Sequence, residues 1–255
     1  MKRVFGLIGF PLTHSFSKGY FNEKFSREGL EAVYENFPLK NIEEFPALIE
    51  SHPALAGLNV TIPYKQSVIP YLDELGEEAA AMGAVNVIVP VKKEGKIRLI
   101  GRNSDYLGFR DSIRPEIDRL RASSDHEAKA LILGTGGASK AVYYALRQLD
   151  IEAYFVSRDT AKAGYTYAML NAKLIEEFKI IVNTTPLGMA PDTESFPDLP
   201  YKAIGQGHLL YDLVYNPSLT RFLSLGQQAG ARIMNGAGML KIQAEAAWKM
   251  WNRQL

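Results

Sequence analysis

The sequence predicts an α/β protein made of two domains. Short apolar runs alternate with helical stretches over about the first hundred residues, which is typical of an α/β domain. After the hydrophilic stretch 121–126, an apolar run, a glycine turn and a helical pattern follow one another directly, as at the start of a second α/β domain. A chain of 255 residues is long enough for two modest domains that each bury a core.

In the first half, apolar runs and capping residues set the expected elements. Ser15 or Ser17 can cap the first helix, and Asn41 can cap a second helix that ends near residue 51. Pro63 suits the first turn of a further helix, and Gly83 suits the end of another. The expected strands are 4–9, 32–37, 57–61, 85–91 and 97–100, and the expected later helices are 75–82 and 105–120.

The second half is organised around the stretch 129–149. Residues 130–133 form an apolar run suited to a strand buried on both faces, and Gly134, Thr135, Gly136 and Gly137 follow. A helix with one apolar stripe comes next, formed by Ala138, Ala141, Val142, Ala145, Leu146 and Leu149. Further strands are expected at 152–156, 180–183 and 209–213, and a last helix at 239–251.

Composition excludes several classes of function. The net charge is +1 and there is no long basic run, which argues against nucleic acid as a partner. No apolar stretch reaches the roughly 18–20 residues of a membrane helix. The absence of cysteine fits a reducing cytoplasm, and four scattered histidines make a metal site unexpected. We therefore expect a cytoplasmic protein. We expect it to be a monomer or a homodimer, although the sequence does not decide between them.

The glycine turn suggests a dinucleotide site. Glycines let the backbone approach a pyrophosphate, and the N-terminus of the next helix offers free N–H groups. The motif is imperfect because Ser139 stands where a third glycine belongs, so a purely structural turn remains open. At the end of the next strand, Arg158 favours the 2′-phosphate of NADP and Ser157 can bind the same phosphate, whereas the carboxylate of Asp159 opposes it.

Polar residues also gather where strands of the first domain end. Asn59 and Thr61 share one face of a strand that runs toward Lys65. Asn86 lies within an apolar run, where an amide needs a partner. Asp105 starts a helix. Each has a structural alternative: a solvated lysine, a satisfied core amide and a helix N-cap.

Eight segments in this order resemble the shikimate dehydrogenase family from Val4 to Trp251. They are Gly9-x-Pro11-x-x-His14-Ser15-x-Ser17, Asn59 to Lys65, Gly83 to Asn86, Asn103-Ser104-Asp105-x-x-Gly108, Gly134-x-Gly136-Gly137-Ala138, Asn183 to Met189, Tyr211 to Tyr215 with Pro217, and Asn235-Gly236-x-Gly238-Met239-Leu240-x-x-Gln243-Ala244. The resemblance implies a substrate-binding domain of residues 1–104 plus 236–255 and a Rossmann-type NADP-binding domain of residues 105–235. It also implies that the C-terminal helix returns to the first domain.

The resemblance implies a role for each matching residue. Lys65 and Asp105 would be the catalytic pair. The substrate would be bound by Ser15, Ser17, Asn59, Thr61, Asn86, Tyr215 and Gln243. The cofactor would be bound by Glu77, Gly134, Thr135, Gly136, Gly137, Ala138, Ser157, Arg158, Thr184, Leu213, Gly236 and Met239. The implied reaction is the reversible reduction of 3-dehydroshikimate to shikimate with NADPH, on the route to chorismate and the aromatic amino acids.

Reduction of a ketone builds negative charge on its oxygen, so a proton donor must lie within reach. Lys65 could shuttle that proton, or it could be a fixed cation that orients the substrate; the sequence leaves both open, although a neighbouring carboxylate would favour the charged form. An NAD-dependent quinate/shikimate dehydrogenase, a catalytically idle NADP-binding regulatory module and a methyltransferase that binds S-adenosylmethionine are the alternatives.

The chain departs from the usual family pattern at three places. Phe21 precedes Asn22 in the first helix, where members usually have histidine, and we expect Phe21 to serve in packing. Ser104 replaces the commoner threonine. Ser157, Arg158 and Asp159 replace the usual Asn-Arg-Thr, which bears on cofactor preference.

Overall fold

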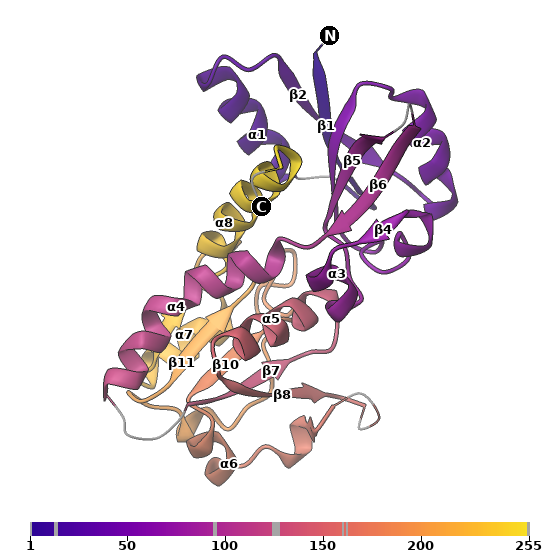
Figure 1. The fold of residues 1–255 in the computed structure, drawn as a ribbon. Coiled ribbons are helices and arrows are strands. Elements are labelled where there is room, and N and C mark those ends of the chain that lie inside the picture. The colour runs from indigo at the N-terminus through magenta and orange to yellow at the C-terminus, as the bar shows by residue number, and fades with distance from the viewer. Residues whose placement is uncertain are drawn as a thin grey trace. The chain divides into compact units, whose positions relative to one another are not determined.

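A computed structural model describes residues 2–12, 15–93, 96–123, 128–159, 161 and 163–253. His14 of the first segment, Glu94 and Gly95 in the charged hairpin tip, and residues 124–127 of the expected linker lie outside the described residues. Contacts between residues divide the chain into two units, 1–104 with 244–255, and 105–243. Both units are α/β, as predicted, and the C-terminal helix extends into the first unit (Figure 1).

The first unit is built on a mixed sheet. Its strands are β1 (Arg3–Gly9), β2 (Ala32–Pro38), β3 (Leu55–Val60), β4 (Glu74–Leu75), β5 (Val87–Lys93) and β6 (Lys96–Arg102). They lie in the order β2-β1-β3-β5-β6-β4, with β1 parallel to both of its neighbours and β5 antiparallel to both of its own. The carboxyl ends of β1 and β3 and the beginning of β5 therefore meet at one edge.

Helices cover both faces of this sheet. One face packs against η1 (Ile42–Glu44), α2 (Phe45–Ser51), η2 (Ile69–Tyr71) and α3 (Glu77–Met82). The other face carries an aromatic cluster shared with α1 (Phe16–Arg27) and the last turns of α8 (Ala237–Trp251); its rings are Phe5, Phe21, Phe25, Tyr34, Trp248 and Trp251. Phe21 is fully buried in this cluster, so its expected role in packing is confirmed.

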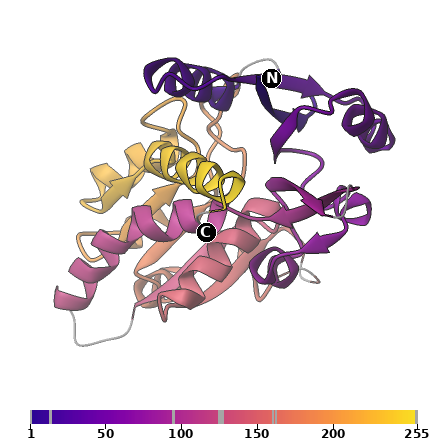
Figure 2. The ribbon, with the colours of Figure 1, turned by 45° about the horizontal axis from the view of Figure 1, so that its top comes forward.

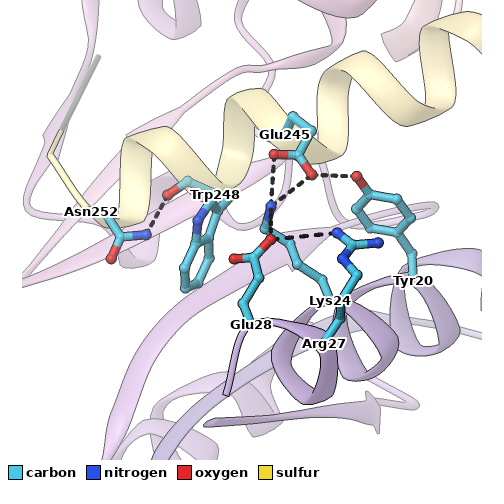
Figure 3. A network of polar contacts seen from close by, with 7 residues as sticks. All are labelled: Tyr20, Lys24, Arg27, Glu28, Glu245, Trp248 and Asn252. Atoms are coloured by element: carbon cyan, nitrogen blue, oxygen red, sulfur yellow. Dashed lines mark hydrogen bonds and ion pairs between the residues drawn. The ribbon is translucent and has the colours of Figure 1, made fainter. Parts of the chain in front are cut away.

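A polar network on the same side fastens α8 to α1 (Figure 3). The ammonium of Lys24 lies 3.0 Å from each carboxylate oxygen of Glu245 and 3.1 Å from Glu28. The Tyr20 hydroxyl donates to Glu245 as well. Burial alone would lower the pKa of Lys24, but its hydrogen bonds to Glu245 and Glu28 outweigh burial and raise the pKa. Lys24 is therefore charged although its side chain is almost completely buried.

The second unit has a parallel sheet. Its strands are β7 (Lys129–Leu133), β8 (Glu152–Ser157), β9 (Tyr165–Thr166), β10 (Ile180–Asn183), β11 (Leu209–Asp212) and β12 (Arg232–Met234). They lie in the order β12-β11-β10-β7-β8-β9, and all of the pairs are parallel. This is the strand order of a Rossmann sheet. The strands β7, β8 and β9 follow one another toward one edge, and β10, β11 and β12 follow one another toward the opposite edge, so the order reverses between β7 and β10.

Helices cover both faces of the second sheet too. Figure 2 shows α4 (Asp105–Ser123) and α5 (Gly137–Gln148) side by side, and both pack with Met239 of α8 on one face. The other face packs against η4 (Tyr167–Met169), α6 (Ala172–Glu177), η5 (Tyr201–Ala203) and α7 (Arg221–Gln228). The apolar stripe expected on α5 is confirmed at Ala141, Val142, Ala145 and Leu146, while Ala138 is half-buried.

Three expectations differ from the structure. No helix begins at Pro63: residues 62–68 form turns, and the amide of Val85 donates to the Lys65 carbonyl at 2.7 Å, which joins these turns to the segment before β5. Residues 121–123, expected in a linker, are the last residues of α4. Asp105 is the first residue of α4 rather than the residue before it.

Candidate active site

In the first unit, the predicted substrate residues meet at the edge where β1 and β3 end. Ser15 follows β1 and caps α1, its side chain accepting from the Lys18 amide at 3.1 Å. Asn59 lies near the end of β3, and the Thr61 amide donates to the Ile8 carbonyl at 2.9 Å, which ties the end of β3 to β1. The parallel pairing of β1 and β3 thus places Asn59 opposite Leu7, close to the carboxyl end of β1.

Lys65 and Asn86 lie at the same edge. The Val85 amide donates a hydrogen bond to the Lys65 carbonyl at 2.7 Å, which joins Lys65 to the segment before β5. Asn86 is buried, and its amide is held on both sides: Oδ1 accepts from the Ser104 amide at 2.6 Å and Nδ2 donates to the Ser104 hydroxyl at 3.1 Å. The structural alternative for Asn86, a satisfied core amide, is therefore realised. Its position beside Asn59, at the start of β5, is also compatible with a substrate contact.

Two further residues were not found by sequence reasoning. Tyr34 is fully buried, and its hydroxyl donates to Asn59 Oδ1 at 2.8 Å. In the second unit, Asp212 is a fully buried carboxylate that has no cationic partner among the described residues. An aromatic residue in an alternating strand is more often core than functional, so Tyr34 carried no distinguishing signal. Asp212 lies inside an apolar run and within one of the eight segments of the resemblance, and this signal could have identified it.

Glu77, a predicted cofactor residue, lies on α3 of the first unit. It is exposed in the first turn of α3, whereas the adjacent Glu78 is buried and accepts from Arg102 Nε at 2.5 Å. Glu78 thus serves the fold of the first unit. The expected approach of Glu77 to a cofactor stays a prediction.

In the second unit, the glycine turn lies at the carboxyl end of β7. Gly134 has a φ of +104°, a conformation that glycine adopts without strain. Its amide donates to the Val156 carbonyl at 2.8 Å, which places the turn next to the end of β8. Thr184, at the end of β10, lies on its other side, with Oγ1 donating to the Leu133 carbonyl at 2.6 Å. The turn therefore occupies the point where the strand order reverses.

The start of α5 is suited to an anion. Gly136 occupies the N-cap and has no side chain to cap the first N–H groups, and a Cβ there would meet no atom within 4 Å. Ser139, which replaces the third glycine, is buried, and its hydroxyl donates to the Gly136 carbonyl at 2.6 Å. The serine is thus accommodated inside the turn. Uncapped N–H groups at the N-terminus of a twelve-residue helix bind phosphate well.

The residues after β8 bear on the choice of cofactor. Asp159 Oδ1 accepts from the Ala161 amide at 3.0 Å, and the Asp159 amide donates to the Ser157 hydroxyl at 3.2 Å. The carboxylate therefore caps its own loop. Arg158 is exposed, and its charge lowers the pKa of Tyr167 against the larger rise that burial causes. Uncapped helix amides and an exposed arginine at the end of β8 fit a dinucleotide with a 2′-phosphate.

Two of the predicted nicotinamide residues, Thr184 and Leu213, lie on loops that are joined by hydrogen bonds to the buried carboxylate of Asp212. Asp212 Oδ1 accepts from Asn183 Nδ2 and from the Val214 amide, both at 3.0 Å, and Oδ2 accepts from Thr220 Oγ1 at 2.6 Å. These bonds hold the loop after β10, which carries Thr184, and the loop after β11, which carries Leu213. Tyr215 follows on the second loop and is 43% exposed, so it is available to a ligand.

The start of α8 packs closely against this region. A Cβ at Gly236 would lie 2.1 Å from the Leu213 carbonyl oxygen, so only glycine allows this approach. Met239 and Gln243 follow on α8, where they face Gly108 of α4, one turn after Asp105. Both Gln243 and Asp105 are buried. The second unit thus brings Asp105 near Gln243, and Leu213 near Gly236.

Comparison with known proteins gives consistent results. The family model for the shikimate dehydrogenase substrate binding domain matches residues 7–88. Shikimate dehydrogenase (NADP(+)) of Geobacillus kaustophilus is 34% identical over 100% of this chain and 94% of its own, and that of Halothermothrix orenii is 37% identical over 98% and 90%.

Solved structures agree over almost the whole chain. Shikimate 5-dehydrogenase from Thermus thermophilus in complex with NADP(H) and shikimate matches with a TM-score of 0.83 and 30% identity, over 99% of this chain and 94% of the other. Shikimate 5-dehydrogenase from Listeria monocytogenes in complex with shikimate and NAD matches with a TM-score of 0.81 and 28% identity, over 99% and 92%.

Proposed function

Because the chain belongs to the shikimate dehydrogenase family, we propose that it catalyses the reversible reduction of 3-dehydroshikimate to shikimate with NADPH. The main support is the set of polar residues at one edge of the first sheet, where Asn59, Thr61 and Lys65 lie at or after the end of β3 and Asn86 lies just before the start of β5. A ring with several hydroxyl groups and a carboxylate needs many donors and acceptors in one place, and these residues supply them. A place in the route to the aromatic amino acids and a cytoplasmic location remain predictions.

We assign a role to each unit from the family-model match and the strand order. The first unit, which the substrate-binding family model matches over residues 7–88, is proposed to bind the substrate. The second unit, with its Rossmann strand order and glycine turn, is proposed to bind NADP. The resemblance implies a boundary at Gly236, and the division of the chain into two contact units, which falls at Ala244 within α8, supports a return of α8 to the first unit.

The proposed chemistry uses few groups of the chain. NADPH, when bound, supplies the hydride that adds to the carbonyl carbon. The oxygen gains negative charge and needs a proton, which Lys65 is proposed to hold or deliver, with Asp105 as its carboxylate partner. Ser15, Ser17, Asn59, Thr61, Asn86, Tyr215 and Gln243 are proposed to hold the ring hydroxyls and the carboxylate.

The cofactor site is proposed on the second unit. The amides at Gly136, Gly137 and Ala138 would hold the pyrophosphate, with Gly134 and Thr135 forming the turn. Ser157 and Arg158 would hold the 2′-phosphate, supported by the engagement of the Asp159 carboxylate with its own loop. Thr184, Leu213, Gly236 and Met239 would line the nicotinamide pocket, and Glu77 would approach the cofactor.

An NAD-dependent quinate/shikimate dehydrogenase is the second candidate, and one observation favours it: a carboxylate, that of Asp159, follows Arg158 directly. Initial rates with shikimate or quinate, each with NADP+ or NAD+, separate the two. We expect shikimate with NADP+ to give the highest kcat/KM. A higher value with NAD+ would contradict the role of Arg158, and a higher value with quinate would contradict the substrate.

A further inference from the structure

Tyr34 lies on β2 directly beside the proposed substrate residues. It is fully buried, and its hydroxyl donates to Asn59 Oδ1 at 2.8 Å. We infer that Tyr34 is a positioning residue, which fixes the side-chain amide of Asn59 in the orientation that binds shikimate. The inference rests on the proposed function, because it concerns how that substrate is held.

Both the backbone and the ring of Tyr34 are held by residues of α1. Asn22 of α1 bonds the Tyr34 backbone twice: its Nδ2 donates to the Tyr34 carbonyl and its Oδ1 accepts from the Tyr34 amide, both at 2.9 Å. The Phe21 ring stacks on the Tyr34 ring with centroids 5.0 Å apart and an interplanar angle of 13°. Because β2 is an edge strand, Asn22 takes the place of a missing neighbour, and the hydroxyl is fixed relative to β3.

The bond from Tyr34 decides which way the Asn59 amide points. Asn59 Nδ2 donates to the Asn86 carbonyl at 3.2 Å, while Oδ1 accepts from Tyr34 on the other side. An asparagine amide has two N–H donors and two acceptor positions. The two bonds use one of each, so one donor and one acceptor position remain in a fixed direction for a substrate hydroxyl.

The same chain of bonds reaches two other proposed substrate residues. On one side, a hydrogen bond from Ser17 lowers the pKa of Tyr34, against the larger rise caused by burial. On the other side, Asn59 Nδ2 donates to the carbonyl of Asn86, and the Asn86 side chain accepts from the Ser104 amide. Tyr34 is therefore the centre of a continuous network beneath the proposed substrate.

The alternative is that Tyr34 serves only the fold, as a ring in the aromatic cluster. Tyr34→Phe separates the two roles because it keeps the ring and its stacking but removes the hydroxyl. Loss of one hydrogen bond to a buried amide corresponds to roughly a three- to tenfold change in an equilibrium constant. We expect the dissociation constant of shikimate, measured by calorimetry, and its KM to rise by this factor, while the KM for NADP+ stays within about twofold.

Tyr211→Phe is the matched control. Tyr211 is also fully buried, its hydroxyl lies 2.8 Å from Ser112 Oγ, and its ring packs on Phe109 with centroids 4.9 Å apart. The control variant likewise loses a buried tyrosine hydroxyl, but in the second unit, which does not include Asn59. We expect it to lose a comparable amount of thermal stability without a change in the dissociation constant of shikimate.

A double-mutant cycle tests whether Tyr34 acts through Asn59. In an Asn59→Ala background, Tyr34→Phe should have little further effect on shikimate binding, because the amide that it orients is gone. An unchanged shikimate dissociation constant in Tyr34→Phe, or a loss that persists in the Asn59→Ala background, would overturn the inference. If the unmodified protein turns over shikimate with NADP+ and Tyr34→Phe equals it, only the inference fails; if the unmodified protein neither binds nor oxidises shikimate, the proposed function fails and the inference with it.

Discussion

The buried carboxylate of Asp212 shows how one residue can organise two loops. It accepts hydrogen bonds from Asn183, Val214 and Thr220, which come from the ends of two strands and from the start of α7. Burial raises the pKa of Asp212 to about 6, and these hydrogen bonds oppose the rise without cancelling it. The folded protein therefore binds this proton more tightly than the unfolded chain does.

That difference predicts a pH-dependent stability. As pH rises from about 4 to about 6, the contribution of Asp212 to the free energy of unfolding falls, by about 2–3 kcal/mol for a pKa difference of this size. Asp212→Asn has no such group. The free energy of unfolding of Asp212→Asn, measured by urea denaturation relative to the unmodified protein, should rise by this amount between about pH 4 and about pH 7. A difference that stays constant with pH would contradict the prediction.

Lys65 and Asp105 carry the proposed catalysis. Replacing either with alanine removes a group that acts on the proton of the reacting oxygen, so kcat should fall by roughly 10²-fold or more. Steady-state rates with shikimate and NADP+ measure this directly. Lys173→Ala, which removes an exposed lysine on α6, should leave kcat unchanged. Normal turnover in both Lys65→Ala and Asp105→Ala would remove the pair from the mechanism.

Cofactor choice is also decided by a single residue in this account. Arg158→Ala should raise the KM for NADP+ by roughly tenfold or more, because a charged hydrogen bond to the 2′-phosphate is lost, and should change the KM for NAD+ by less than about twofold. Initial rates at varied cofactor concentration give both values. Equal increases for the two cofactors would mean that Arg158 does not recognise the 2′-phosphate.

At the scale of elements, α8 depends on its docking to α1. Lys24 is buried between Glu245 and Glu28, and Glu245 also accepts from Tyr20 (Figure 3). Glu245→Ala leaves the Lys24 ammonium with half of its partners, and we expect the free energy of unfolding to fall by about 2 kcal/mol. Glu28→Ala keeps the stronger partner and should cost less than about 1 kcal/mol.

Chemical denaturation of the two variants tests this ranking. Replacing Lys24 and Glu245 together, as Lys24→Met with Glu245→Leu, should restore much of the loss because no charge is then left buried. If Glu245→Ala and Glu28→Ala lower the free energy of unfolding equally, the contact between α1 and α8 contributes no more to stability than the contact with Glu28 does.

Local sequence signals predicted most elements, and they failed where a distant partner decides. The stripe on α5 and the caps at Ser15 and Gly83 depend on nearby residues, and they were found. The turns around Pro63 are joined to a distant residue, because the amide of Val85, twenty residues after Lys65, donates to the Lys65 carbonyl. The same reason explains why Tyr34 and Asp212 were missed: their importance comes from partners that only the folded sheets bring near.

At the scale of the whole molecule, the resemblance seen in the sequence is confirmed by relatives that match over nearly the full chain. The Rossmann strand order of the second unit and the return of the last helix to the first unit follow the expectation. No helix among the described residues is long and apolar enough to cross a membrane. In the proposed function, the first unit supplies polar groups for a hydroxylated ring and the second unit supplies a site for a dinucleotide.

The most direct test follows NADPH absorbance as 3-dehydroshikimate is added to the purified protein. We expect the absorbance to fall only when protein, NADPH and 3-dehydroshikimate are all present, and to fall much more slowly with Lys65→Ala. An absorbance that does not change, or that falls equally fast with the Lys65→Ala variant, would contradict the account.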